Sequence, residues 1–141
     1  MTELITTLKL YIAVVGGAIA GLFGGCDMIL KALICFVCVD YLTGTVRAIK
    51  ERKLNSRTGF IGLLKKALIF TVVLLAHMLD EVTGIGALRS MAVLFYISNE
   101  GISILENLGK LNVPYPQKLK DILEQLEDEK NEDSEDTKSD N

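Results

Sequence analysis

Two apolar segments, MILKALICFVCVDYLTGTV (28–46) and IGLLKKALIFTVVLLAHML (61–79), flank the basic segment RAIKERKLNSR (47–57). Each apolar segment is close to the roughly 20 residues that a helix needs to cross the hydrocarbon core of a bilayer. Backbone polar groups in lipid must be satisfied within the segment, so both segments are expected to be helices. Because short loops rich in Lys and Arg stay in the cytoplasm, the pattern predicts a transmembrane hairpin with a cytoplasmic loop.

Two further apolar segments lie outside this hairpin, at 4–25 and 90–108. The connections at 26–27 and 80–89 contain one basic residue between them, so both are expected on the outer side. The sequence therefore predicts an all-α, multi-pass bundle of four transmembrane helices with both termini in the cytoplasm. Its first residues, Met1-Thr2-Glu3, lack the basic start of a signal peptide, which favours a retained first helix.

Composition separates a membrane domain (1–110) from a cytoplasmic tail (111–141). Half of the residues are hydrophobic, more than a small soluble domain can bury. Residues 1–120 carry a net charge of +5 and residues 121–141 a net charge of −8. Past Gly109 the chain is expected to leave the membrane, because Val113-Pro114-Tyr115-Pro116 cannot continue a helix. Residues 117–127 are expected to form a short amphipathic helix, and 127–141 to be a disordered acidic tail.

Small residues recur at helical spacing in the first two helices. Such ridges let helix backbones approach closely in lipid, either between copies of the chain or within one chain, and the spacing leaves both alternatives open. The predicted packing residues are Ala13, Gly17, Gly21, Gly25, Gly44 and Ala48.

Acidic side chains within the apolar segments predict a polar seam in the cytoplasmic half of the bundle. Asp40 and Glu100 lie at similar depths, and a charge in the bilayer is costly unless it has a partner or faces water. The seam is either a structural ion pair or the lining of an assembled pore. Its predicted members are Asp40, Lys65, Lys66, Glu100, Ser103 and Asn107.

Catalytic and metal-binding patterns are missing from the sequence. His77 has no nucleophile or metal cluster around it, and Cys35 and Cys38 form a C-x-x-C half-site without a second pair. We therefore expect no enzyme activity, no cofactor, no metal and no nucleic-acid partner.

Two blocks of sequence resemble the toxin-secretion/phage-lysis holin family of Gram-positive bacteria and their phages. The first comprises Asp40-Tyr41-Leu42-Thr43-Gly44, Ala48-Ile49-Lys50, Lys53-Leu54-Asn55-Ser56, Gly59, Gly62 and Lys65-Lys66. The second comprises Asn99-Glu100, Ser103-Ile104-Leu105-Glu106-Asn107 and Pro116-Gln117-Lys118-Leu119. Asn112 stands where the family pattern has glycine, and asparagine tolerates similar backbone angles.

The resemblance implies a protein that oligomerises in the bacterial cytoplasmic membrane and forms lesions through which an endolysin, or a toxin, leaves the cell. The endolysin would be a functional partner without direct contact. Two alternatives remain, a small channel or transporter subunit and a membrane anchor that recruits a soluble partner through the tail. The cytoplasmic basic hairpin comprises Arg47, Lys50, Arg52, Lys53, Asn55, Ser56, Arg57 and Gly59, and is expected to sit near anionic headgroups.

Overall fold

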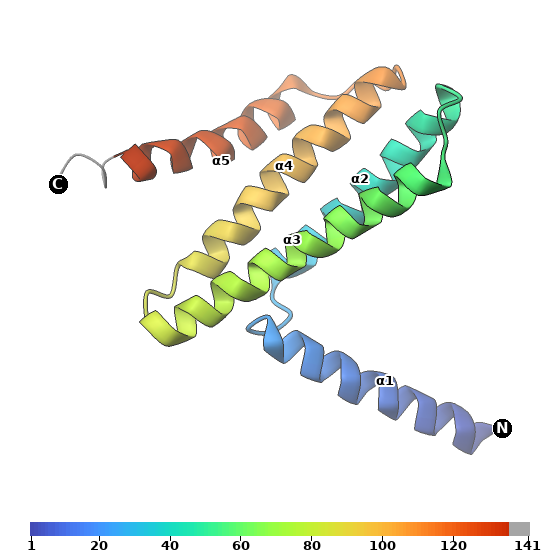
Figure 1. Cartoon of the computed structure of the whole chain (residues 1–141), viewed down its shortest axis with the longest axis vertical. Coiled ribbons are helices and arrows are strands. Elements are labelled where there is room, and N and C mark those ends of the chain that lie inside the picture. The colour runs from blue at the N-terminus through green and yellow to red at the C-terminus, as the bar shows by residue number, and fades with distance from the viewer. Residues whose placement is uncertain (136–141) are drawn as a thin grey trace.

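The fold is a bundle of helices, and the prediction of an all-α chain is confirmed (Figure 1). The computed structural model describes residues 1–135, with side-chain surroundings for residues 1–126. The helices of this part are α1 (Thr2–Leu22), α2 (Met28–Lys50), α3 (Ser56–Thr83), α4 (Leu88–Lys110) and α5 (Gln117–Glu135). Helices α2, α3 and α4 pack together, α5 folds back onto α4, and α1 points away from the bundle.

The turn between α1 and α2 contains two glycines in the left-handed region. Gly24 and Gly25 have φ angles of 76° and 97°, which side chains with a Cβ rarely adopt. This turn ends α1 at Leu22, three residues before the predicted boundary. Asp27 then caps α2 by accepting a hydrogen bond of 3.0 Å from the Leu30 amide.

The helices of the central hairpin extend beyond their apolar segments. Asn55 caps α3 by accepting a 2.9 Å hydrogen bond from the Arg57 amide, so α3 begins at Ser56 and not at the predicted residue 61. Helix α2 likewise continues past residue 46 to Lys50. Apolarity ends at the expected membrane boundary, whereas the backbone hydrogen bonds of a helix continue into polar sequence until a cap stops them.

Helix α5 begins at Gln117 as expected but extends to Glu135, so the prediction of disorder is wrong for residues 128–135. Glu, Lys and Gln are strong helix formers, and Lys120 pairs with Glu124 at 3.3 Å across one turn. The remainder of the predicted disordered tail, 136–141, lies outside the described residues.

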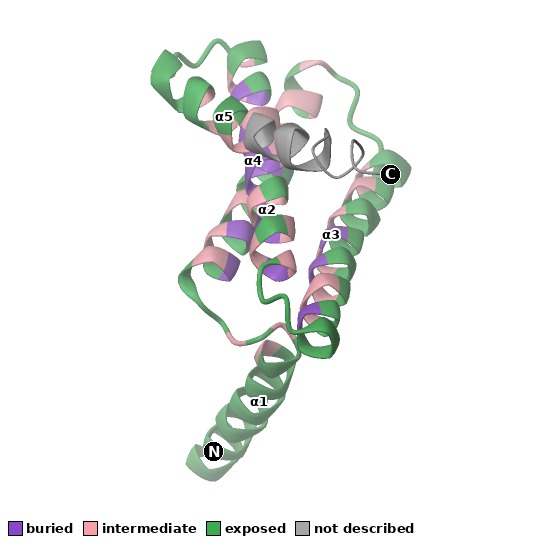
Figure 2. Ribbon diagram, turned by 90° about the vertical axis from the view of Figure 1, so that its left-hand side faces the viewer, coloured by how far each residue is buried: buried purple, intermediate pink, exposed green. Residues whose placement is uncertain are grey.

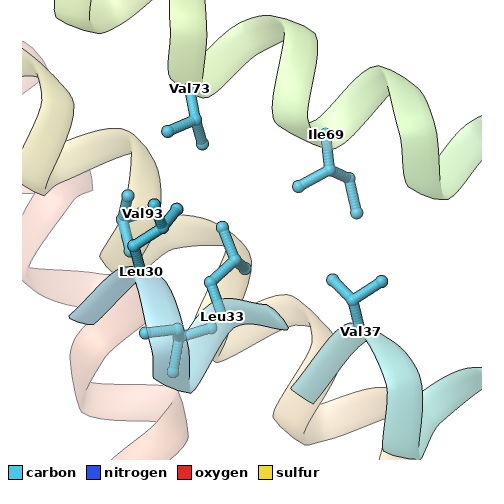
Figure 3. Packing of buried hydrophobic residues seen from close by; sticks show 7 residues of the cluster. Leu30, Leu33, Val37, Ile69, Val73 and Val93 are labelled. Atoms are coloured by element: carbon cyan, nitrogen blue, oxygen red, sulfur yellow. The ribbon is translucent and has the colours of Figure 1, made fainter. Parts of the chain in front are cut away.

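The apolar core lies between α2, α3 and α4 (Figures 2 and 3). Leu33, Val73 and Val93, one from each helix, are fully buried. The other buried members of this cluster are Leu30, Val37, Ile69 and Ile97. By contrast, α1 contains no buried residue.

Three helices, α1, α2 and α3, are long and apolar enough to cross a membrane. Helix α4 is of similar length but falls below this measure of apolarity. Asn99, Glu100, Glu106 and Asn107 lower its mean hydropathy, and all but Glu106 are at least half-buried in the bundle.

Candidate functional site: a buried ionic cluster

The three bundle helices each contribute one charged side chain to a buried ionic triad. Lys66 of α3 lies 2.6 Å from a carboxylate oxygen of Asp40 on α2, and its ammonium group also pairs with Glu100 of α4. Asp40 and Glu100 are only 7% and 6% exposed. Burial of two acids against one base is tolerated because the ammonium donates to both carboxylates. The triad is defined hereafter as Asp40, Lys66 and Glu100.

A hydrogen-bond network links the triad to the basic hairpin. The Asn107 amide of α4 donates to Asp40 at 3.2 Å and to the Thr43 hydroxyl at 3.3 Å. Arg47 donates to the side-chain oxygen Oδ1 of Asn107 at 3.3 Å and binds Glu51 at 2.9 Å. The pKa of Glu51 is lowered by the hydrogen bond from this guanidinium. The network therefore connects the ends of α2 and α4 to the buried charges.

Two predicted members of the polar seam lie outside this network. Lys65 is exposed, because consecutive helical residues point about 100° apart and only Lys66 faces α2 and α4. Ser103 is half-buried on α4, and no side-chain hydrogen bond within the described residues joins it to the triad.

A crevice between α2 and α3 leads from the hairpin to the triad. Its volume is about 180 Å³, and its walls include Asn55 and Lys53 at one end and Asp40 and Lys66 at the other. Glycines of both helices line the crevice, and because they have no side chain they leave its space open. They are Gly44, Gly59 and Gly62. The crevice, whose lining is largely apolar, thus reaches two of the buried charges, Asp40 and Lys66.

The predicted packing residues fall into two groups. In α1, a Cβ added at Gly17 or Gly21 would meet no atom within 4 Å, and Ala13 is exposed, so this ridge lies against no described helix of the same chain. Gly25 belongs to the turn after α1 and not to the ridge, because of its positive φ.

In α2 the two predicted packing residues both lie in the bundle. A Cβ on Gly44 would lie 3.6 Å from the Asn107 amide, which places this glycine at the α2–α4 contact. Ala48 is half-buried and lines the crevice.

The cations of the basic hairpin differ in whether they bond to the rest of the bundle. Lys50 donates to the Lys110 carbonyl oxygen at 3.0 Å and thereby satisfies the last turn of α4. Arg52, Lys53 and Arg57 are exposed, and Lys53 also pairs with Glu51 at 3.5 Å. Ser56 begins α3, and Gly59 lies one turn later, against the crevice.

A second polar cluster at the opposite end of the bundle was not predicted. Arg89 of α4 is 9% exposed and binds both carboxylate oxygens of Asp27, at 2.8 and 3.1 Å. It also donates to the carbonyl oxygens of Phe23 and Gly25. The Arg89 guanidinium beside Asp27 lowers the pKa of that carboxyl below its usual range. Arg89 therefore ties the turn between α1 and α2 to the start of α4.

At the same end of the bundle, a side chain of α3 fixes the start of α4. Asp80 of α3 accepts hydrogen bonds from the backbone amides of Leu88 and Arg89, at 3.0 and 2.8 Å. His77 packs against the turn, where a Cβ on Gly24 would lie 2.8 Å from its ring. The only sequence signal for this cluster was the presence of Asp27 and Arg89 in the two connections that contain few basic residues.

No set of His, Cys, Asp and Glu side chains among the described residues is grouped as metal ligands. The two clusters are held together by charge pairing and hydrogen bonding.

The model of the bacteriophage holin family matches residues 17–128. An uncharacterized 14.9 kDa protein of the nagH 3' region of Clostridium perfringens is 42% identical over 132 residues, covering 92% of this chain and 100% of that protein. The uncharacterized protein YqxH of Bacillus subtilis is 43% identical over 110 residues, covering 77% of this chain and 78% of YqxH.

A phage protein is among the relatives. A probable holin of Bacillus phage phi105 is 40% identical over 90 residues, covering 63% of this chain and 67% of that protein. No solved structure matches the chain. The family match covers α2, α3, α4 and the first part of α5, and thus both polar clusters, but only the end of α1.

Proposed function

Because this chain belongs to the bacteriophage holin family, we propose that it self-associates in the bacterial cytoplasmic membrane and opens lesions that cause timed host lysis. The lesions would release an endolysin that waits in the cytoplasm, or a toxin, without direct contact between the two proteins. The protein acts in this proposal through packing and charge, and not as an enzyme.

The observation that carries the proposal is the buried triad within apolar helices. Lys66 pairs with both Asp40 and Glu100 between three helices, and the triad keeps a formal charge of −1. Charges of this kind are stable in lipid only while they are paired or face water. A bundle that repacks around them would keep the charges satisfied by turning them toward a water-filled lesion, and the crevice beside Lys66 supports such access.

The proposed threading has four passes with both termini and the basic hairpin inside. Helices α1, α2 and α3 have the required length and apolarity, and α4 is the proposed fourth pass. Its polar side packs against α2 and α3, which would shield it from lipid. In this arrangement residues 1–110 form the membrane domain and 111–141 the cytoplasmic tail.

Two alternatives predict different behaviour. A channel or transporter subunit, favoured by the buried acids, would give graded and ion-selective conductance without leakage of folded protein. An anchor that recruits a partner through its tail would need a free binding face on α5. The apolar residues of α5 line a cavity on the bundle, and two of them, Leu119 and Ile122, remain 49% and 45% exposed. Deletion of residues 121–141 would therefore abolish the function of an anchor, whereas it should change the timing of a holin more than its competence.

The test is inducible expression in a bacterium that also makes a cytoplasmic muralytic enzyme. We expect abrupt lysis after a delay, and only when both proteins are present. Expression of either protein alone is the control. Continued growth of cells in which the chain has accumulated in the membrane would refute the proposal, and selective conductance without enzyme release would favour the channel.

A further inference from the structure

The buried triad contains more acid than base. Lys66 supplies a single positive charge to two carboxyl groups, so the fully ionised triad has a formal charge of −1. Asp40 lies seven residues before Arg47, which places it about 10 Å inside the membrane boundary in the proposed threading. A net charge at that depth is costly, and a buried acid responds to such a cost by taking up a proton.

Other cations of the bundle are paired elsewhere and do not balance the second acid. Arg47 reaches Asp40 only through the Asn107 amide and is itself paired with Glu51. Lys53 lies at the far end of the crevice and also pairs with Glu51. The remaining charged side chains near the triad on α3 and α4, and those of α5, are exposed or bonded within their own helix. They are Lys65, Glu106, Lys120, Asp121 and Glu124.

The hydrogen bonds indicate which carboxyl group is the better place for a proton. Asp40 accepts from the Lys66 ammonium at 2.6 Å with one oxygen and from the Asn107 amide at 3.2 Å with the other. Two donors of this kind favour its ionised form. Glu100 accepts from the same ammonium and also forms a hydrogen bond with the Asp40 carboxyl. Two ionised carboxylates have no donor for such a bond, whereas a protonated Glu100 supplies one.

We propose that the triad is a proton-binding site, in which Glu100 holds one proton at neutral pH and donates it in a hydrogen bond to the Asp40 carboxylate. Lys66 stays charged and balances Asp40, so the folded bundle has no net charge at this level. The crevice, which Tyr41 lines as a neutral phenol, reaches Asp40 and Lys66 from the hairpin end, and the proton exchanges with water from that end. This inference rests on the proposed function for the position of the triad within the membrane.

Infrared spectroscopy tests the site directly, because the C=O stretching band of a protonated carboxyl group is separate from the bands of carboxylates and backbone amides. The full-length chain is reconstituted at neutral pH in vesicles of ether-linked phosphatidylglycerol and phosphatidylcholine, which contain no ester carbonyl. We expect the wild-type chain to show the band of one protonated carboxyl group.

Three substitutions assign that band. Glu100→Gln removes the proton-binding group and keeps an amide donor toward Asp40, so the band should disappear. Asp40→Asn leaves Glu100 and Lys66 as a balanced ion pair, so the band should disappear here too. Glu106→Gln removes an exposed carboxylate from the same helix and should leave the band unchanged.

The pH dependence of unfolding separates proton binding from a merely structural role of Glu100. Above the ordinary pKa of glutamate, about 4.3, the unfolded chain has released the proton that the folded chain still holds. The stability of the folded chain should therefore fall as the pH rises. Relative to Glu100→Gln, the unfolding equilibrium constant of the wild type should increase about tenfold per pH unit, until the folded chain also releases the proton. Glu106→Gln should follow the wild type.

The outcomes distinguish this inference from the proposed function. A wild-type spectrum without the band, a band that survives Glu100→Gln, or the same pH dependence for the wild type and Glu100→Gln would each overturn the inference. If the band is missing but the chain still lyses cells together with a muralytic enzyme, the inference fails alone. If the band behaves as expected and the chain causes no lysis, the proton site stands and the proposed function fails.

Discussion

The ammonium group of Lys66 satisfies carboxylates from two other helices, and this makes it the most sensitive single position of the bundle. Lys66→Met keeps the shape of the stem and removes the charge, which leaves Asp40 and Glu100 buried without their base. Loss of one partner of a buried ion pair costs about 3–5 kcal/mol. Denaturant unfolding in detergent micelles, followed by circular dichroism, measures this change in the free energy of unfolding.

The neighbouring lysine supplies the matched control. Lys65→Met removes the same charge from an exposed position and should change stability by less than about 0.5 kcal/mol. Neutralising the whole triad at once, with D40N, K66M and E100Q in one chain, should recover much of the loss, because no buried charge is then left without a partner. Equal destabilisation by Lys66→Met and Lys65→Met would contradict the geometry of the triad.

The Asp27–Arg89 pair makes the end of the bundle opposite the hairpin sensitive to acid. The pKa of Asp27 is lowered by the guanidinium, so its stabilising contribution is complete above the ordinary aspartate pKa of about 3.9. The contribution is lost as the pH falls through the lowered folded-state pKa. Thermal unfolding in micelles between neutral and acidic pH should therefore show a step below about pH 3.9 that is missing in Asp27→Asn.

A second substitution separates charge from capping at this position. Asn is as good a cap as Asp, whereas Asp27→Ala loses the hydrogen bond to the Leu30 amide. Asp27→Ala should thus cost about 1 kcal/mol more than Asp27→Asn at neutral pH. The same stability for both variants would argue against the cap.

At the residue level, the sequence indicated the depth of Asp40 and Glu100 but not which lysine faces them. Lys65 and Lys66 are equivalent in hydropathy, and only the rotation of α3 against its neighbours distinguishes them. The Arg89–Asp27 pair was missed for a related reason. Its members are 62 positions apart in two separate connections, and no helical spacing relates them.

Among the elements, α1 has an unusual position because its small-residue ridge contacts nothing else in the described chain. Gly17→Leu or Gly21→Leu should reduce self-association in vesicles, measured by chemical cross-linking, while the unfolding free energy of the bundle stays unchanged. Gly16→Leu adds the same side chain to an adjacent face of α1 and is the control. Loss of bundle stability in the Gly17 variant would mean that α1 packs within its own chain.

The exposed cations of the hairpin should affect the attraction to the membrane surface, whereas Arg47 should affect the stability of the bundle. Replacing Arg52, Lys53 and Arg57 by Gln should weaken attraction to anionic headgroups by about 1 kcal/mol per residue and shift the time of lysis. Arg47→Gln instead removes hydrogen bonds to Asn107 and Glu51 and should destabilise the bundle by about 1–3 kcal/mol. Lysis timing that is the same with and without the three exposed cations would exclude a role for them.

Helix existence was predictable from apolarity, and helix ends were not. Apolar segments located α1 to α4, because each has a membrane-length run of hydrophobic residues. The ends depend instead on local polar groups, such as the Asn55 cap and the Gly24-Gly25 turn. The length of α5 was underestimated because low hydrophobicity was taken to mean disorder, although Glu-rich and Lys-rich sequence is intrinsically helical.

For the whole molecule, the proposed threading can be tested with an existing thiol. Cys26 lies exposed in the turn between α1 and α2, at the end of the bundle opposite the hairpin. In a chain without Cys35 and Cys38, it should react with a membrane-impermeant maleimide added to intact cells. A cysteine introduced by Ser56→Cys should react only after permeabilisation. The reverse pattern would invert the threading.

The charged side chains at the two ends of α2 also fix the length of the bundle that can lie in lipid. Asp27 and Arg47 lie at the two ends of α2, twenty residues apart, which corresponds to about 30 Å of helix and to the hydrocarbon thickness of an ordinary bilayer. A shift along the membrane normal would draw Asp27 or Arg47 into lipid, so the bundle can adapt to a thinner or thicker bilayer only by tilting or by deforming the lipid around it. A change in the acyl-chain length of the lipid should therefore change the tilt of this protein or deform the lipid around it.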